Sequence, residues 1–386
     1  MRMRREFYLL LAVGLLLLVL TMELLAYMPT KAEASLEVLD VEVEGPLLTV
    51  RYRLRAGDLP IDVQLVFVLR NGTPVDRPIY VYYDSEYQMS CSNPWTVKWF
   101  VDRLVRELSK RGYKGPVSVV NATGLKVLLT DLDAALGKVL IVPTGALPDT
   151  VFTKEYNLLK PWVKAGGVVF WLAGYFLYYS AKRTDEPLNW QDPWHPRDEG
   201  ADEFFGVEHS MKLTRYYVVA DMPTYYSRAL CLRYRFLYRN IGLSTLYAMG
   251  GRALGYIYEL EDGTAVPSIS YVPVGKGAVV LFGGVLEPSE AITAAASDVA
   301  QILALGILDA EVAGFETYSL RPGEVVEGTA QLLPGGRYEA LWIYMFSLGD
   351  ITGLFKAVEV KLSDYVIRPT RATVLRGLCE TMLGED

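Results

Sequence analysis

The segment 175–205 contains the residues of this sequence that are best suited to binding or chemistry. Its aromatic and imidazole side chains are Tyr175, Tyr178, Tyr179, Trp190, Trp194 and His195, and its acids are Asp185, Glu186, Asp192, Asp198, Glu199, Asp202 and Glu203. Aromatic faces beside carboxylates are what a carbohydrate-binding cleft uses, and two suitably separated carboxylates can hydrolyse a glycosidic bond. Three interpretations follow: a solvated acidic loop, a binding surface made by Tyr175, Trp190, Trp194 and His195, or a pair of catalytic acids.

This sequence has few residues that are suited to nucleophilic catalysis or metal binding. His195 and His209 are the only imidazoles, and neither has a nucleophile beside it that would need a general base. Cys91, Cys231 and Cys379 form no CxxC motif, whereas a structural zinc site usually needs about four such ligands close together. No glycine-rich phosphate loop is present. We therefore expect no catalytic residue, no metal and no cofactor.

The stretch 232–239 is the second unusual feature. It reads Leu-Arg-Tyr-Arg-Phe-Leu-Tyr-Arg, so that arginines alternate with aromatic or apolar residues for most of its length. A period of two predicts a strand with one buried face and one basic face. The basic face suits anionic glycans or lipid headgroups, and the alternative is that its arginines pair with local acids.

Short apolar strands are predicted to position these residues. Runs that are apolar on both faces and separated by helical segments are typical of parallel strands covered by helices on each side. The runs are 79–83, 117–120, 139–142 and 168–172.

Two helices are predicted between these strands. Asn93 is a natural N-cap, Pro94 suits the first helical position, and Gly112 ends the helix. A second helix is predicted over 149–164, with a kink or restart at Pro161, which lacks a backbone donor.

Both ends of the chain predict antiparallel strands. We infer that they combine into one β-sandwich of about seven strands, with the α/β domain inserted between them. The alternative is two separate β layers packed on the α/β domain. The expected boundaries are 1–35 for an N-terminal segment, 36–76 and 309–386 for the sandwich with a terminal helix, and 77–308 for the α/β domain.

The N-terminal sequence predicts the cellular compartment of the protein. Arg2, Arg4 and Arg5 precede an apolar run, 8–28, that is long enough to span a bilayer as a helix. Positive charges stay on the cytoplasmic side, so we expect a single-pass anchor with the bulk of the chain outside the cytoplasm. The alternative is cleavage after Ala34, which would release a secreted protein.

Composition narrows the class of partner. The chain has 386 residues and a formal net charge of −7, whereas nucleic-acid binding needs a basic face, so we expect no nucleic-acid partner. Asparagine and glutamine are sparse, which is typical of a thermophile.

Three stretches resemble the class I glutamine amidotransferase-like superfamily. They are 138–145 (KVLIVPTG), 162–172 (WVKAGGVVFWL) and 273–284 (PVGKGAVVLFGG). The resemblance covers about 77–308 and implies an α/β fold with a mostly parallel sheet and helices on both faces.

The catalytic residues of that family are missing from this sequence. Active members carry a cysteine on the turn after the strand that matches 168–172, and a histidine after the late strand. Here the first turn has Ala173, Gly174 and Tyr175, and the late position has Gly283. The resemblance therefore implies a degenerate, catalytically silent member, of a kind found in membrane-associated transport and surface assemblies.

These observations favour an exported, membrane-anchored binding or scaffold protein without catalytic activity. The expected partners are the membrane, through the N-terminal helix, and a protein or glycan. One alternative is a glycosidase-like surface hydrolase that uses the acids of 185–203, and another is an accessory subunit of a membrane transporter.

Overall fold

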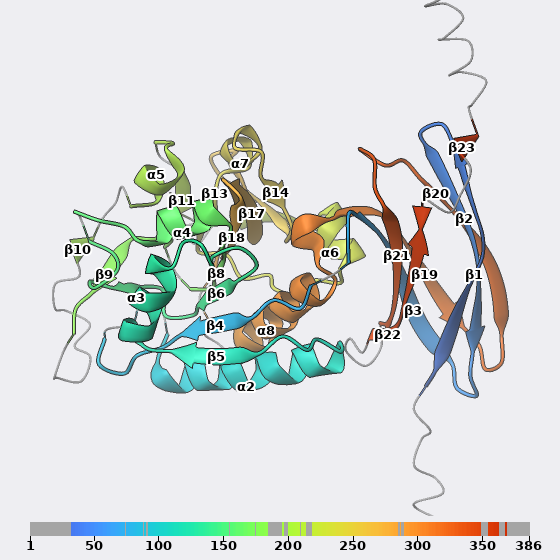
Figure 1. The fold of residues 1–386 in the computed structure, drawn as a ribbon, viewed down its shortest axis with the longest axis horizontal. Coiled ribbons are helices and arrows are strands. Elements are labelled where there is room, and N and C mark those ends of the chain that lie inside the picture. Colours follow the sequence, from blue (N-terminus) through green and yellow to red (C-terminus); the bar gives the residue numbers. More distant parts are fainter. Residues whose placement is uncertain are drawn as a thin grey trace, which may run out of the picture.

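The computed structural model describes most of the chain between residues 32 and 368. The described residues are 32–73, 75–87, 89, 92–153, 155–173, 175–183, 195–196, 200–208, 210–213, 218–284, 286, 289–348, 354–362 and 367–368. They form two parts that lie side by side along the long axis of the molecule (Figure 1). One part is built on a seven-stranded sheet with helices, and the other consists of two four-stranded sheets.

The seven-stranded sheet has the strand order β14-β17-β18-β8-β6-β4-β5. Its strands are β4 (Ile79–Tyr82), β5 (Val117–Val120), β6 (Val139–Val142), β8 (Val168–Trp171), β14 (Arg252–Ala253), β17 (Ile269–Val274) and β18 (Gly277–Phe282). The strands from β18 to β5 pair in parallel, whereas β17 and β14 pair antiparallel at the other edge.

Helices cover both faces of this sheet. They are α2 (Pro94–Lys110) and α8 (Ser289–Ala304) on one face, and α3 (Ala122–Thr130) and α4 (Leu159–Ala165) on the other. Along β6, Val139 and Ile141 belong to the core beneath α2 and α8, whereas Leu140 and Val142 belong to the core beneath α3 and α4. Because successive side chains point to opposite faces, a strand covered on both sides is apolar throughout.

Short elements fill the chain between β8 and β17. They are β9 (Tyr179–Ala181), β10 (His195–Pro196), α5 (Gly200–Phe205), β11 (Met211–Leu213), β12 (Val218–Met222), α6 (Tyr225–Ala229), β13 (Arg239–Ile241), α7 (Leu243–Ala248), β15 (Ile257–Leu260) and β16 (Ala265–Pro267). The strands among them form three small sheets together with β7 (Leu147–Pro148). Every pairing in these sheets except β7 with β9 is antiparallel. A 3₁₀ turn, η1 (Ile307–Asp309), follows α8.

The second part is a sandwich of two sheets, ordered β20-β2-β1-β23 and β19-β3-β21-β22. Its strands are β1 (Ala34–Glu44), β2 (Leu47–Ala56), β3 (Ile61–Arg70), β19 (Glu311–Leu320), β20 (Val325–Leu332), β21 (Ala340–Ser347), β22 (Leu354–Lys361) and β23 (Ile367–Arg368). Each sheet contains both N-terminal and C-terminal strands, so the two ends of the described chain form one core.

Strand β3 is buried on both faces. Leu65 and Phe67 belong to the core between the two sandwich sheets, whereas Val66 and Val68 belong to the core that contains α2 and α8. The same strand therefore contributes to both parts of the molecule.

The fold class expected from the sequence is wrong for the chain as a whole. The described residues are 40% strand and 24% helix, and most of their sheets are antiparallel, which does not fit a single parallel-sheet α/β protein. Many strands between β8 and β17 have only two to five residues. Such strands are too short to show a period of two, so the sequence pattern does not reveal them.

The described residues give no support for the expected transmembrane helix. Among the residues that the structure describes, no helix is both long and apolar enough to cross a membrane. The apolar run 8–28, on which the expectation rested, lies outside those residues.

Two local predictions differ in outcome. Helix α2 begins as predicted, because Asn93 Oδ1 accepts a hydrogen bond from the N–H of Thr96 at 2.9 Å. The helix predicted over 149–164 is wrong in its first half, since α4 starts only at Leu159. Asn157 Oδ1 accepts from the N–H groups of Leu159 and Lys160 and so caps the helix there.

Removal of the C-terminal strands tests whether the two ends depend on each other. We expect deletion of 319–386 to give an insoluble protein, because β2 loses β20, β3 loses β21, and their apolar faces become exposed. Deletion of 369–386 leaves every described strand in place and serves as the control. Solubility and the melting transition of both truncations are the measurements. If the protein that lacks 319–386 is soluble and melts like the intact chain, the two ends do not share a core.

Candidate functional site

Tyr175, a predicted binding residue, is packed within the protein beside an arginine. Its ring centroid lies 4.0 Å from the guanidinium carbon of Arg239, and the ring of Tyr178 lies 5.5 Å from the same carbon. Arg239 Nε is buried and has no hydrogen-bond partner among the described residues, so the aromatic faces stabilise its charge. Tyr175 therefore already has a cationic partner from its own chain.

The structure does not describe the side chains of the other predicted binding residues. Trp190 and Trp194 lie outside the described residues, as do the acids from Asp185 to Glu199. Of His195 the structure describes the backbone, which pairs with Ser180 in the sheet of β9 and β10.

Asp202 has a structural role in this segment. Its Oδ1 accepts hydrogen bonds from the N–H of Ser210 at 2.8 Å and from the hydroxyl of Ser210 at 2.6 Å. Glu203 contributes its backbone carbonyl, which accepts from the ammonium group of Lys160. Neither arrangement places two carboxylates face to face, so the described residues provide no acid pair here.

The turn after β18, where the resemblance places a histidine, has a steric reason for its glycines. A Cβ atom on Gly284 would lie 2.5 Å from the hydroxyl oxygen of Tyr234 and 2.7 Å from Cβ of Phe236. The backbone N–H groups of Tyr238 and Arg239 also donate to the carbonyl of Gly283. Close approach of the chain at 234–239 therefore excludes a side chain at this turn.

Cys231 is also unsuited to nucleophilic chemistry. It is not part of a disulfide, and burial raises the pKa of its thiol to about 11. The group is therefore a neutral thiol at pH 7, whereas the thiolate is the nucleophile.

A cavity lined by arginines lies between α2, α8 and residues 233–236. We call it the arginine groove: a hollow of about 510 Å³ lined by Trp99 and Arg103 of α2, by Arg233, Arg235 and Phe236, and by the first half of α8. Sequence analysis identified Arg233 and Arg235 as a basic face. It did not connect them with α2 or α8, which lie more than fifty residues away along the chain.

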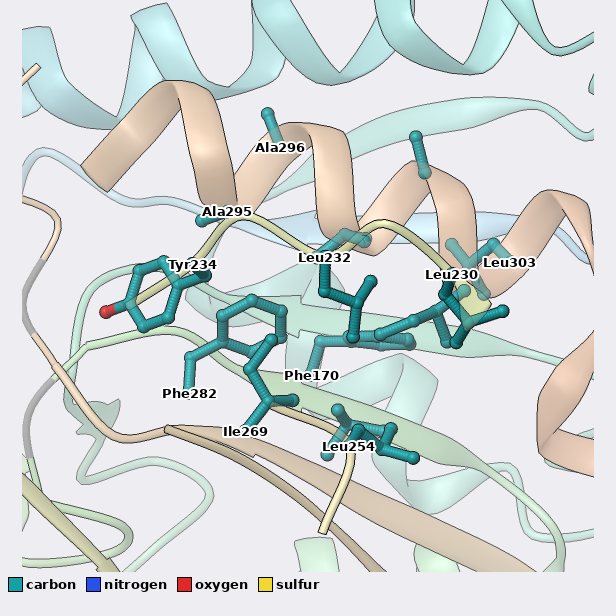
Figure 2. Packing of buried hydrophobic residues seen from close by; sticks show 14 of the residues in the cluster. Phe170, Leu230, Leu232, Tyr234, Leu254, Ile269, Phe282, Ala295, Ala296 and Leu303 are labelled. Carbon is teal, nitrogen blue, oxygen red and sulfur yellow. The ribbon is translucent and has the colours of Figure 1, made fainter. Parts of the chain in front are cut away.

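The residues 232–238, which we call the arginine segment, are not a strand as predicted. The structure shows no regular secondary structure from Leu232 to Leu237. The alternation is nevertheless real, because Leu232 and Tyr234 are buried while Arg233 and Arg235 are exposed. Figure 2 shows Leu232 and Tyr234 in the core with Phe282, beside α8.

The carboxylate of Asp298 replaces the missing neighbouring strand. It is 1% exposed and accepts hydrogen bonds from the backbone N–H groups of Arg233, at 3.0 Å, and Tyr234, at 2.8 Å. Burial raises the pKa of this carboxyl to about 7, against the lowering effect of the two N–H groups and of Arg111 and Arg233. Asp298 therefore fixes the position of the arginine segment, and sequence analysis missed it.

A buried charge network lies beneath the groove. Glu107 of α2 is fully buried and forms ion pairs with Arg111 at 2.8 Å and Arg103 at 3.2 Å. Arg111 also donates to the side chains of Gln301, at 2.7 Å, and Ser297, at 3.2 Å, both on α8. Burial acts to raise the pKa of Glu107, but Arg111 and the other cations lower it overall. The network therefore joins α2 to α8 and holds Arg103 at the groove.

The charges of the groove favour an anion. Three guanidinium groups and one carboxylate, that of Glu290, line the hollow. The first turn of α8 also faces it, and a helix N-terminus carries partial positive charge. Across the described residues, no cluster of histidine, cysteine or acidic side chains could hold a metal ion.

A larger hollow, of about 980 Å³, lies at one end of the sandwich. Its lining includes the turn residues Gly45 and Pro46 and the charged residues Arg337, Glu339 and Lys361. Opposite charges are mixed there, and residues 363–366, which follow its lining along the chain, lie outside the described residues. The arginine groove is therefore the better-defined candidate.

Comparisons with known proteins do not assign a family. No protein-family model and no curated protein matches the sequence. Similar solved structures include an exo-β-1,4-mannosidase from Opitutaceae bacterium strain TAV5, which is 14% identical over 60% of this chain and 36% of its own, with a TM-score of 0.31. A β-galactosidase from Rahnella sp. R3 is 14% identical over 75% of this chain and 41% of its own, with a TM-score of 0.35. A β-galactosidase from Bacillus circulans sp. alkalophilus is 9% identical over 74% of this chain and 40% of its own, with a TM-score of 0.30.

These similarities are too low to carry an argument about fold or activity. This chain spans about two fifths of the length of each of these structures. All three are glycosidases. None of the comparisons supports the amidotransferase-like assignment made from the sequence.

The raised pKa of Asp298 predicts a pH-dependent stability. The folded-state pKa of about 7 lies above the ordinary value of 3.8, so the folded protein holds this proton more tightly between those values. The contribution of Asp298 to the free energy of unfolding is therefore fully present below pH 3.8 and is lost as the pH rises through 7. Relative to an Asp298→Asn variant, which does not titrate, the wild type should lose on the order of 4 kcal/mol over this range.

Denaturant unfolding of both proteins from pH 4 to pH 8 measures this difference. Other titrating groups are common to both proteins and cancel in the comparison. A difference in unfolding free energy that stays constant with pH would show that Asp298 has an ordinary pKa.

Proposed function

We propose that this chain is a non-catalytic binding module that takes an anionic ligand in the arginine groove. The observation that carries the proposal is the convergence of three guanidinium groups on one concave surface of a protein whose net charge is −7. Like charges held together repel one another, and a bound anion removes that repulsion. An extracytoplasmic location stays a prediction from Arg2, Arg4 and Arg5.

Arg233 and Arg235 have donors to offer a ligand. Among the described residues, no carboxylate forms an ion pair with the guanidinium of Arg233. The carboxylate nearest to Arg235, that of Asp221, lies 4.0 Å away, and both side chains are about half exposed. An exposed ion pair of this length contributes little, so it does not compete strongly with a bound anion.

Arg235 is also oriented before a ligand binds. Its guanidinium carbon lies 4.2 Å from the ring centroid of Tyr256, and one of its terminal nitrogens donates to the hydroxyl of Tyr256 at 2.8 Å. The planar guanidinium is thereby held in a defined orientation, which lowers the entropy lost when it forms a two-point contact with a carboxylate, sulfate or phosphate.

The groove is equipped for binding rather than for bond cleavage. The residues that line it include one carboxylate, that of Glu290, and neither cysteine nor histidine. Glycoside hydrolysis needs two carboxyl groups on either side of the scissile bond, and covalent catalysis needs an activated nucleophile.

Glycoside hydrolysis is the second candidate function. It is favoured by the cluster of acids and aromatic residues in 175–205. Within that cluster, Asp202 is engaged by Ser210, and the acids from Asp185 to Glu199 lie outside the described residues.

Substitution of two groove arginines tests the proposed function. We expect equilibrium dialysis of the full chain against radiolabelled sulfate at low ionic strength to show a saturable site. The variant Arg233→Gln/Arg235→Gln should bind sulfate at least tenfold more weakly, because each lost charge-assisted hydrogen bond is worth about 1.5–3 kcal/mol. Arg321→Gln, an exposed arginine in the turn between β19 and β20, is the matched control for loss of a positive charge.

Two results would oppose the proposal. Absence of a saturable site in the wild type, or equal binding by the double variant, would remove the groove as the binding site. Release of reducing ends from oligosaccharides by the wild type would favour the glycosidase candidate instead.

A further inference from the structure

We propose that the ligand is an acidic oligosaccharide, and that Trp95 and Trp99 form a second subsite that stacks on its sugar rings. This inference rests on the proposed function, because it extends the arginine groove along α2. It adds a named class of ligand and a direction in which that ligand lies.

A row of three side chains on α2 leads into the groove. Trp95, Trp99 and Arg103 are spaced four residues apart, so they lie above one another on a single face of the helix over about 12 Å. The rings of Trp95 and Trp99 are in contact, with centroids 4.7 Å apart and planes at 53°. Trp99 lines the groove, and Trp95 continues the aromatic surface beyond its mouth.

The core of the protein does not require Trp95. The side chain is 63% exposed, whereas Val97 and Phe100, on the neighbouring face of the helix, are buried against the sheet. An exposed indole beside a half-buried one presents a large, flat apolar surface to solvent, and a sugar ring covers such a surface with its C–H face. Arginines at one end and indoles at the other therefore fit a ligand that carries both charge and rings.

The small number of cations in the groove limits how much negative charge a bound ligand can carry. Arg103, Arg233 and Arg235 face one internal carboxylate, that of Glu290, and Arg103 is already paired with Glu107. A nucleic acid needs a basic face, and this protein has a net charge of −7, which disfavours such a partner. A short uronic-acid oligomer supplies carboxylates for the few arginines and sugar rings for the indoles.

The shape of the groove disfavours a lipid surface. Arg103 is only 23% exposed within the hollow, so a single extended chain reaches it more readily than the flat face of a bilayer does. The observations therefore favour an oligosaccharide over an anionic membrane.

Competition with sulfate tests this assignment on the full chain. Tetragalacturonate and galacturonic acid are compared for their ability to displace radiolabelled sulfate from the wild type, from Trp95→Ala and from Tyr247→Ala. Tyr247 is 55% exposed on α7 and serves as the matched aromatic control. Trp95→Ala leaves the core intact, and its circular dichroism should match that of the wild type.

We expect tetragalacturonate to displace sulfate from the wild type at concentrations about tenfold lower than from Trp95→Ala. Galacturonic acid should act equally on both, because one ring with one charge occupies the arginine end alone. Fully methyl-esterified tetragalacturonate, which keeps the rings and loses the charges, should displace sulfate poorly. Tyr247→Ala should behave as the wild type.

The outcomes separate this inference from the proposed function. Saturable sulfate binding with tetramer and monomer equally effective, or an unchanged tetramer response in Trp95→Ala, would overturn the oligosaccharide assignment and leave the anion site in place. A lack of saturable sulfate binding would overturn both. Stronger, Trp95-dependent displacement by tetrathymidylate or by phosphatidylserine vesicles would replace the oligosaccharide with a nucleic acid or a membrane.

Discussion

The two-sided burial of β3 is the constraint on which the rest of the structure depends. Leu65 and Phe67 face the sandwich core, while Val66 and Val68 face the core that contains α8. One strand therefore holds the two parts of the molecule together. A buried polar side chain of β3 that faces the neighbouring part extends the constraint. The amide of Gln64 donates to the carbonyls of Arg228 and Ala229 at the end of α6, where the arginine segment is about to begin. Such terminal helix carbonyls lack partners within their own helix, and the sandwich supplies one.

Three backbone anchors then determine the path of the arginine segment. Gln64 binds the backbone just before the segment, and Asp298 binds two N–H groups within it. The carbonyl of Gly283 binds the backbone at its end. Because all three anchors act on the backbone, the side chains of Arg233 and Arg235 are left to face solvent. The groove is in this sense a by-product of how an irregular segment is held against a core, and its charge comes from the residues that alternate outward.

The sequence was informative where a single segment carries its own signal. The capping residue Asn93 and the apolar runs of the parallel strands could be identified, because burial on both faces and helix ends leave local patterns. The arginine segment shows the limit of that approach. Its alternation correctly separated the buried Tyr234 from the exposed Arg233, but the same pattern arises whether the backbone pairs with a strand or with a carboxylate. Asp298, sixty-five residues away, decided between the two, and no local pattern identifies such a partner.

The position of β3 between two C-terminal strands also affects how the protein folds during its synthesis on the ribosome. Strand β3 is complete at Arg70, but the strands on both sides of it, β19 and β21, begin only at Glu311 and Ala340. At a synthesis rate of roughly 5–20 residues per second, β3 waits on the order of tens of seconds for its neighbours. During that interval β3 can pack against β2 but lacks both of the strands that it hydrogen-bonds to, and pairing across such a separation is intrinsically slow. We therefore expect the nascent chain to need a holding chaperone until its last strands emerge.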